Sequence, residues 1–271
     1  MTGRNENPGV AADAVVAPPE SRAGEIPWRS ISLLVLLAVW AIAAWLFDTK
    51  TLPAPWTVAL AMHAHIVDGS LPFHAGVTFA RSFVAFLFAM FLGTLLGILM
   101  GNSRRLNAIL DTGLVIGLNL PALVVIILFY VWFGLNEFAA IAAVVVNKAP
   151  VVAAIVREGA RSVDSGLLEV GRVFGLPARR VTFRIYLPQL YPQLAAAARS
   201  VFSLSWKIML VVELLGRSNG IGFQMRRFFN YFDITSILAY SIAFIALVLL
   251  VELTVLQPLE RHANRWRKVR P

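Results

Sequence analysis

The sequence predicts an all-helical membrane protein with six transmembrane helices, and three observations support this fold class. The 271-residue chain is 58% hydrophobic, has a mean hydropathy of +0.73 and contains only 14% charged residues, which is too apolar for a soluble globular chain of this size. Several windows of about 18 or more residues are nearly free of charge, and this length crosses a hydrocarbon core of roughly 30 Å. The sequence lacks the ten-residue alternation of a membrane barrel, so backbone amides in lipid must be satisfied within helices.

Six apolar segments are long enough to form these helices. In chain order they are Ile31–Phe47, Arg81–Met100, Gly113–Phe133, Phe138–Val156, Leu194–Leu215 and Ile234–Leu256.

The chain is expected to form one membrane domain with tails. The first 27 residues lack the basic start and the cleavage site of a signal peptide. The expected divisions are a disordered cytoplasmic tail (1–28), the first helix with an outer interfacial segment (29–76), the core domain (77–258) and a basic cytoplasmic tail (259–271).

The segment after the first helix is predicted to lie along the outer membrane interface. Pro53, Pro55 and Trp56 open it, and the mixed apolar stretch that follows ends near Ile66. This stretch is too short and too polar to cross a bilayer.

Small residues and prolines mark the helices that follow. Gly93, Gly97 and Gly101 recur every four residues in the second helix, a pattern typical of close helix packing within a subunit or between two. Three prolines are expected to bend or break their helices locally: Pro121, Pro150 and Pro192.

The fourth and fifth helices carry charges near their centres. Lys148 lies beside Asn147 in the fourth helix, and the fifth contains Lys207 and Glu213. An unpaired charge at this depth is expensive, so such residues usually face a cavity or a partner. We interpret Asn147, Lys148, Lys207 and Glu213 as lining an anion path, because ammonium groups donate hydrogen bonds to anions. Ion pairing with Glu213 or snorkelling remains the alternative; Lys207 and Glu213 do not share a helix face.

A polar loop, residues 157–193, joins the fourth and fifth helices and is long for a connection within a helical membrane domain. Leu167, Val170 and Phe174 recur at helical spacing, which predicts a short amphipathic helix. Asp164 or Ser165 can cap its start.

The end of this helix and the return to the membrane are also predicted. Gly175 is a suitable residue to end the helix. A second helical stretch is expected to follow Pro177 and to stop at Pro188, because proline lacks an amide donor.

The distribution of basic residues predicts the orientation. Sixteen lysines and arginines fall in the two tails, the turn between the second and third helices and the loop over residues 157–193, whereas five fall on the opposite side. Cytoplasmic segments carry the excess of basic residues. Both termini are therefore expected to be cytoplasmic, and the net charge of +9 does not require a nucleic acid partner.

The 157–193 loop resembles the cytoplasmic motif of the permease subunits of binding-protein-dependent ABC importers, written E-A-A, three residues, G, nine residues, I-x-L-P. The residues that match in register are Glu169, Gly175, Ile185, Leu187 and Pro188. Val170 and Gly171 replace the two alanines, which weakens the helix slightly. The resemblance implies that this helix sits in a groove of a separate ATPase subunit, with the contact formed by Glu169, Val170, Gly171, Arg172, Phe174, Gly175, Ile185, Leu187 and Pro188.

The resemblance extends from about Val77 to Arg267 and is greatest to the nitrate, sulfonate and taurine branch. The segments that carry it include Ser103-Arg104-Arg105, Trp132-Phe133-Gly134-Leu135, Val212-Glu213-Leu214-Leu215 and Asn219-Gly-Ile-Gly-Phe223. It implies the type I ABC importer permease fold and uptake of a small anion across the bacterial inner membrane.

The same resemblance implies an assembly. The expected partners are a dimer of ATPase subunits, a periplasmic or lipid-anchored substrate-binding protein, a second permease subunit that makes a homodimer, and membrane lipids. No cofactor is expected on this chain, because ATP and Mg²⁺ would be bound by the ATPase.

The outer stretch over residues 217–233 is too apolar for a loop fully in water. In the resembling family this region lies near the outer mouth, and Phe223, Arg226 and Arg227 are therefore expected to face the binding protein. The alternative is that its aromatic side chains only anchor the segment at the interface.

Other function classes find little support in the sequence. It has no G-x-x-x-x-G-K-[ST] phosphate loop and no H-E-x-x-H zinc motif, so a catalytic chain is not expected, and without cysteine it has no thiolate chemistry. A secondary transporter or channel for a small anion is the alternative, although repeated halves and a relay of buried carboxylates are not evident.

Overall fold

The computed structural model describes residues 28–47 and 51–258. Its helices, in chain order, are α1 (Trp28–Phe47), α2 (Pro55–Val67), α3 (Ser70–Asn102), α4 (Arg104–Asn119), α5 (Ala122–Phe133), α6 (Glu137–Arg161), α7 (Ser165–Val173), α8 (Ala178–Val181), the π-helical turn η1 (Thr182–Tyr186), α9 (Leu187–Gly216), α10 (Ile221–Asn230), α11 (Ile234–Val251) and the π-helical turn η2 (Glu252–Leu256). Apart from Trp28, both predicted tails lie outside the described residues.

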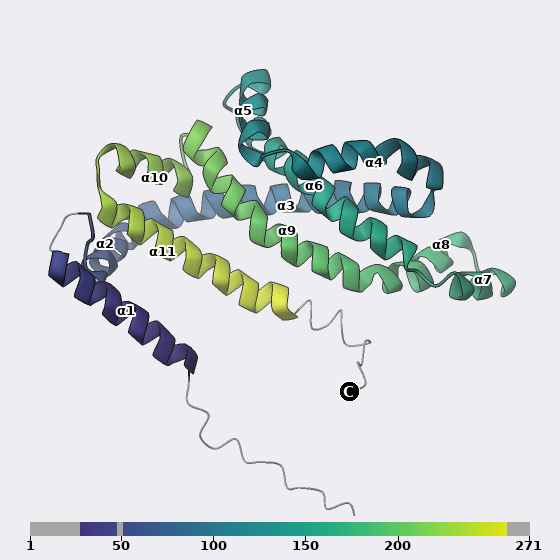
Figure 1. Cartoon of the computed structure of the whole chain (residues 1–271), viewed down its shortest axis with the longest axis horizontal. Coiled ribbons are helices and arrows are strands. Elements are labelled where there is room, and N and C mark those ends of the chain that lie inside the picture. Colours follow the sequence, from purple (N-terminus) through teal and green to yellow (C-terminus); the bar gives the residue numbers. More distant parts are fainter. Residues whose placement is uncertain (1–27, 48–50, 259–271) are drawn as a thin grey trace, which may run out of the picture.

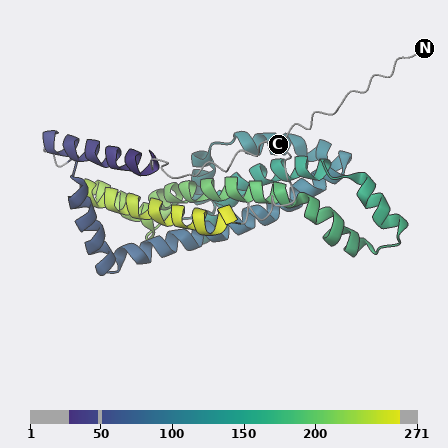
Figure 2. The same ribbon diagram turned by 90° about the horizontal axis from the view of Figure 1, so that it is seen from below.

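The helices form an elongated bundle in which α3, α6 and α9 run side by side (Figure 1). The short helices α7 and α8 lie at one end, which we call the loop end, and α2 and α10 lie towards the other (Figures 1 and 2). α1 lies at the edge, where the indole nitrogen of Trp40 donates a hydrogen bond to the carbonyl of Pro53 at 3.1 Å.

The all-helical membrane class predicted from the sequence is confirmed, and each of the six predicted segments falls on helix. Among the described residues, four helices are long and apolar enough to cross a membrane, or five if α4 and α5 form one broken span. The first predicted segment, Ile31–Phe47, is a shorter apolar helix. Length and composition therefore support four or five spans, against the six predicted.

The third predicted span is two helices and not one. α4 and α5 are bent by 100° relative to one another at a break of at most four residues. The break contains Pro121, which precedes the first residue of α5 and whose extended backbone caps that helix. Proline cannot donate to the preceding turn, and its ring pushes the residue before it out of helical conformation, which explains the break.

The second predicted span begins too late in the sequence. α3 starts at Ser70 and not at Arg81, so it includes residues assigned to the outer interfacial segment. Gly69 precedes it with a φ of +78°, which only glycine adopts easily. Pro72 is tolerated because the first amides of a helix have no intrahelical acceptor.

The fifth helix also begins earlier than predicted. The chain does not stop at Pro188: α8, η1 and α9 form one helical run of 39 residues, Ala178–Gly216. The amide of Leu187 donates to the carbonyl of Thr182, five residues back. This wider turn lets the helix pass the missing amide donor of Pro188.

The glycine stripe predicted for close packing faces α6 within the same chain. A β-carbon added at Gly97 would lie 2.7 Å from the Val156 β-carbon and 2.8 Å from the carbonyl oxygen of Ala153. Gly93 and Gly101 meet α6 in the same way. The absence of side chains lets the two helix backbones approach closely.

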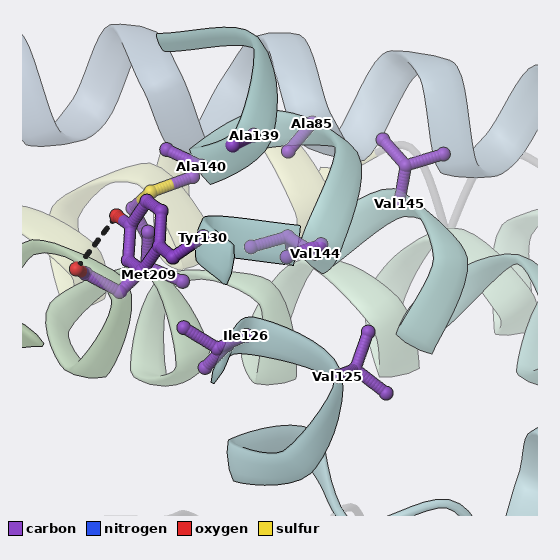
Figure 3. Close-up of a cluster of buried hydrophobic side chains, with 11 residues drawn as sticks. Ala85, Val125, Ile126, Tyr130, Ala139, Ala140, Val144, Val145 and Met209 are labelled. Atoms are coloured by element: carbon purple, nitrogen blue, oxygen red, sulfur yellow. Dashed lines mark hydrogen bonds between the residues drawn. The ribbon is translucent and has the colours of Figure 1, made fainter. Parts of the chain in front are cut away.

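A cluster of buried side chains joins α3, α5, α6 and α9 (Figure 3). The Tyr130 hydroxyl lies inside it and donates a hydrogen bond to the Val212 carbonyl at 2.9 Å, drawn as a dashed line in Figure 3. Hydrocarbon offers no polar partner, so the hydroxyl would be left without a hydrogen bond if α5 and α9 separated. The bond therefore holds α5 against α9.

Candidate functional site

The predicted helix of the 157–193 loop is α7, and its start is capped as expected. The Asp164 carboxylate accepts a hydrogen bond from the Gly166 amide at 2.8 Å. The Asp164 amide in turn donates to the Gln189 side-chain oxygen at 2.9 Å. The cap residue of α7 is therefore tied to the first turn of α9.

Gly175 ends α7, as predicted. Its φ is +65°, and its amide donates to the Arg172 carbonyl at 2.9 Å. The Leu176 amide donates to the Gly171 carbonyl at 3.0 Å. These two bonds make a Schellman motif, which requires a left-handed residue and favours glycine at that position.

α7 packs directly on the turn that leads into α9. A β-carbon added at the buried Gly171 would lie 2.9 Å from the Ile185 δ-carbon and 3.3 Å from a Val181 methyl. Glycine at this motif position therefore allows close contact with Ile185, a second motif residue. The Tyr186 hydroxyl accepts a hydrogen bond from the Asn102 amide at 3.0 Å, which joins η1 to the end of α3.

Several apolar side chains of α7 and of its end are exposed. Leu167 and Val170 are each 50% exposed, Val173 is 85% exposed and Phe174 is 77% exposed. Glu169 is also exposed. The predicted stripe therefore lies on a rigid helix with its apolar residues uncovered, which is typical of a protein contact surface.

Lys148 and Asn147 are buried within the helical bundle, near the break between α4 and α5. Asn147 is 8% exposed, and its amide donates to the Leu120 carbonyl at 3.3 Å. This bond satisfies a carbonyl that the helix break leaves without an intrahelical partner. Lys148 is 9% exposed, and no ion pair to it is found among the described residues.

Lys207 has a different environment from Lys148. It is exposed on α9, and its ammonium lies 5.6 Å from the centre of the Trp206 ring. The place of both lysines on an anion path stays a prediction.

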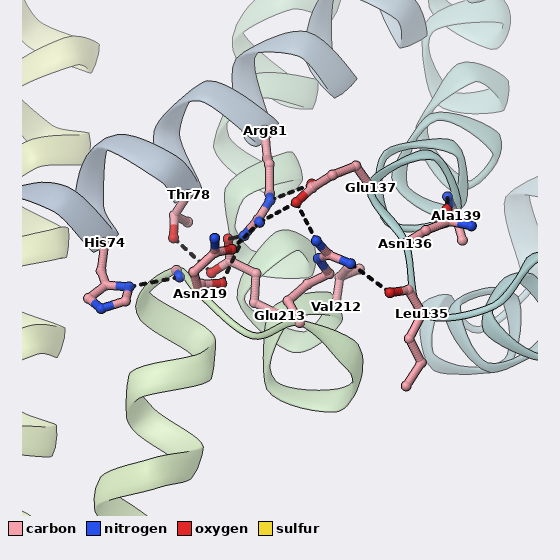
Figure 4. Close-up of polar contacts among 12 residues, drawn as sticks. His74, Thr78, Arg81, Leu135, Asn136, Glu137, Ala139, Val212, Glu213 and Asn219 are labelled. Atoms are coloured by element: carbon pink, nitrogen blue, oxygen red, sulfur yellow. Dashed lines mark hydrogen bonds and ion pairs between the residues drawn. The ribbon is translucent and has the colours of Figure 1, made fainter.

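Glu213 is fully buried and bonded within the chain (Figure 4). Its carboxylate accepts hydrogen bonds from the Thr78 hydroxyl at 2.7 Å, the Arg81 guanidinium at 2.8 Å and the Gly222 amide at 3.1 Å. Three internal donors favour a structural role for Glu213. Its ion-pair partner is Arg81, whereas the sequence suggested a lysine of the membrane helices.

Arg81 is the centre of this buried network. It is 6% exposed and donates at 2.7 Å and 2.6 Å to the two oxygens of Glu137, which opens α6. It also bonds to both the backbone and the side-chain oxygen of Asn219. We call the residues Thr78, Arg81, Glu137, Glu213 and Asn219 the clasp, because they join α3, α6, α9 and the turn before α10.

The edge of the clasp extends to Arg217 and His74. Arg217 bonds to Glu137 and donates to the Leu135 carbonyl at 2.8 Å. The His74 ring nitrogen accepts from the Gly220 amide at 3.0 Å. Among the described residues there is no group of three or more possible metal ligands, and His74 has a structural role here.

The residues predicted to face the binding protein lie on α10 at the clasp end. Arg226 donates to the carbonyls of Leu215 and Arg217 at 3.4 Å and 3.3 Å. Its guanidinium also lies 5.7 Å from the centre of the Phe223 ring. Arg227 is exposed. Arg226 therefore supports the end of α9, and a contact with a partner stays a prediction for all three.

Comparison with known proteins identifies the family. A model of the family described as the binding-protein-dependent transport system inner membrane component matches residues 76–266. The chain belongs to this family. This confirms the resemblance predicted from the motif over residues 169–188.

Curated relatives of this permease match over most of its length. It is 29% identical over 235 residues to the putative aliphatic sulfonates transport permease protein SsuC of Bacillus subtilis (strain 168), covering 86% of this chain and 85% of the relative. It is 26% identical over 242 residues to the taurine transport system permease protein TauC of Escherichia coli (strain K12), covering 87% and 88%.

A solved structure shows the same fold. An inward-facing form of the MetNI methionine ABC transporter aligns with a TM-score of 0.61 and 19% identity, covering 70% of the permease and 94% of that chain. The type I importer permease fold is therefore confirmed. The family also implies an ATPase and a substrate-binding protein as partners.

Proposed function

We propose that this permease forms the transmembrane path of an ATP-driven importer for a small sulfonate-like anion. α7 is its contact with the ATPase, both termini are cytoplasmic, and a second copy completes the path. The substrate class follows from relatives named for aliphatic sulfonates and taurine; nitrate remains a less supported candidate.

The observation that carries the proposal is the combination of a family match with a rigid, uncovered α7. The motif residues Glu169, Gly175 and Ile185 are in register, and α7, which contains Glu169 and ends at Gly175, is capped at both ends. A capped helix packed on η1 moves as one body with α9, so a shift in a partner's groove would move a transmembrane helix.

Lys148 is the residue we propose on the anion path. Lys148 is buried and has no ion pair among the described residues, and its neighbour Asn147 bonds to Leu120 at the break between α4 and α5. Broken helices in transporters often lie beside the substrate path. An unpaired charge at this depth is costly, and a passing anion would offset that cost.

The test is uptake of radiolabelled taurine and of an alkanesulfonate into proteoliposomes containing the permease, its ATPase and its binding protein. We expect accumulation only when all three proteins and ATP are present. Uptake that is driven by an ion gradient without the ATPase would instead establish a secondary transporter.

A matched pair of variants tests the lysine. Lys148→Met should lower uptake by about tenfold or more, because it removes a charged hydrogen-bond donor, whereas ATPase attachment should not change. Lys207→Met, which removes an exposed amine, should have a smaller effect. Normal uptake by Lys148→Met would remove Lys148 from the path.

A further inference from the structure

A hollow lined by arginines lies on the helical run that leads from α7 into the membrane. It has a volume of about 370 Å³ and is open to the surroundings. Its lining residues are Pro177, Arg179, Arg180, Phe183 and Arg184. Three guanidinium groups therefore surround one shallow space, and the family motif includes none of them.

These three arginines have no carboxylate partner within the described residues. The contrast is with Arg157 at the same end of the bundle, which pairs with Asp111 at 2.5 Å and with Glu158 at 3.0 Å. Like charges gathered in one hollow repel each other unless an anion joins them. A guanidinium donates in a fork that fits phosphate oxygens, so a phosphate is the anion that this arrangement suits.

The hollow lies near the point where the helical run is expected to leave the membrane, which suits contact with lipid headgroups. Tyr186 bonds to Asn102, the last residue of α3, and α3 is one of the helices that are apolar enough to cross a membrane. Arg184 and Arg180 lie two and six residues further along the same helix, about 3 Å and 9 Å at 1.5 Å per residue. The headgroup layer on each side of the hydrocarbon core is roughly 5–8 Å thick, so Arg184 falls within it and Arg180 at its outer edge.

Two of the lining residues, Arg179 and Phe183, face away from α7. Gly171 of α7 packs against Val181 and Ile185. Arg179 is two residues from Val181, and Phe183 is two residues from both Val181 and Ile185, which places them on the other side of the helix. Phe183 is 62% exposed beside the arginines. An exposed aromatic ring next to arginines suits the membrane interface better than an acidic protein groove.

We infer that Arg179, Arg180 and Arg184 bind the phosphate headgroup of an anionic phospholipid. The bound headgroup holds the start of the α8–η1–α9 run at the membrane surface and so fixes the level at which α7 is presented. In the proposed orientation this lipid belongs to the cytoplasmic leaflet. The binding itself does not depend on that orientation or on transport.

The test uses the full-length permease in nanodiscs of phosphatidylcholine with a minority of phosphatidylglycerol. Native mass spectrometry of the released protein counts the phosphatidylglycerol that it retains. The variant Arg180→Gln with Arg184→Gln is compared with the α3–α4 variant, Arg104→Gln plus Arg105→Gln, which removes two exposed arginines from the start of α4, next to the end of α3. The charge-preserving variant Arg180→Lys with Arg184→Lys controls for folding.

We expect the affinity for phosphatidylglycerol to fall about five-fold per arginine removed from the hollow. It should be largely kept in the lysine variant and in the α3–α4 variant. Inorganic phosphate in the buffer should not displace the lipid. Equal retention by the hollow variant and the wild type, or an equal loss in the α3–α4 variant, would overturn the inference.

Two further outcomes identify a different ligand. Displacement by inorganic phosphate would overturn the lipid assignment in favour of a soluble phosphate. Unchanged lipid retention together with loss of ATPase attachment in pure phosphatidylcholine would assign the arginines to a protein contact instead.

Discussion

At the scale of single residues, the clasp shows how a carboxylate is kept inside an apolar bundle. Glu213 has no exposed surface and depends on Arg81, Thr78 and a backbone amide for its hydrogen bonds. Burying a charge without such partners costs several kcal/mol. The clasp therefore stabilises one arrangement of α3, α9 and the turn before α10.

The sequence indicated that Glu213 needs a partner but did not identify it. Placing the start of the second helix at Arg81 made this residue a surface charge. α3 begins eleven residues earlier, at Ser70, which is about 16 Å of helix and brings Arg81 inside the bundle. The sequence does contain a signal for this pair, because Arg81 and Glu213 are opposite charges in two different predicted helices.

Replacement of Arg81 by methionine is expected to lower the free energy of unfolding by about 3–5 kcal/mol, because it leaves the buried Glu213 charge unpaired. Denaturant unfolding of the permease in detergent measures this change. Arg226→Met, which removes hydrogen bonds to carbonyl groups only, should cost less. The double variant Arg81→Met with Glu213→Met should recover much of the loss. Equal stabilities of the two single variants would contradict the structural role of the clasp.

At the scale of secondary structure, the sequence predicted the type of element well and the behaviour of proline poorly. The apolar windows, the glycine stripe and both ends of α7 follow from local rules of length, packing and capping. The three membrane prolines do not behave alike: Pro121 breaks a helix, whereas Pro150 and Pro192 lie inside α6 and α9. Whether a helix passes a proline depends on contacts with its neighbours, which one sequence does not reveal.

The π-helical turns illustrate this limit. η1 ends two residues before Pro188, and η2 ends two residues before Pro258. In each case the helix continues into the proline by widening the preceding turn. A rule that ends every helix before proline therefore predicts a stop near Pro188 that the structure does not have.

The α3–α6 contact gives a prediction with a matched control. Gly97→Ala places a β-carbon 2.7 Å and 2.8 Å from atoms of α6 and should cost about 1–3 kcal/mol of stability through overpacking. Gly113→Ala, at a helical glycine with open space around it, should be neutral or gain up to about 1 kcal/mol from helix propensity. Thermal unfolding of both variants in detergent checks this. A Gly97→Ala variant as stable as Gly113→Ala would show that α3 and α6 do not pack this closely.

At the scale of the whole molecule, one helix connects the two sites. The run Ala178–Gly216 begins beside α7 and ends beside the clasp, at opposite ends of the bundle (Figure 1). At 1.5 Å per residue its 39 residues extend over roughly 58 Å. A movement imposed on α7 is therefore transmitted along one continuous helical run towards the clasp end. We propose that ATP hydrolysis on the ATPase changes the shape of the substrate path in this way.

The most direct test of this account is the position of the ATPase on the permease. The chain contains no cysteine, so a single cysteine labels one position without background. Val173→Cys on α7 and Tyr231→Cys at the clasp end replace side chains that are 85% and 75% exposed. Each variant is labelled with benzophenone maleimide, assembled with the ATPase and illuminated. We predict a permease–ATPase adduct from position 173 and none from position 231; an adduct from position 231 alone would contradict the central claim that the ATPase acts through α7.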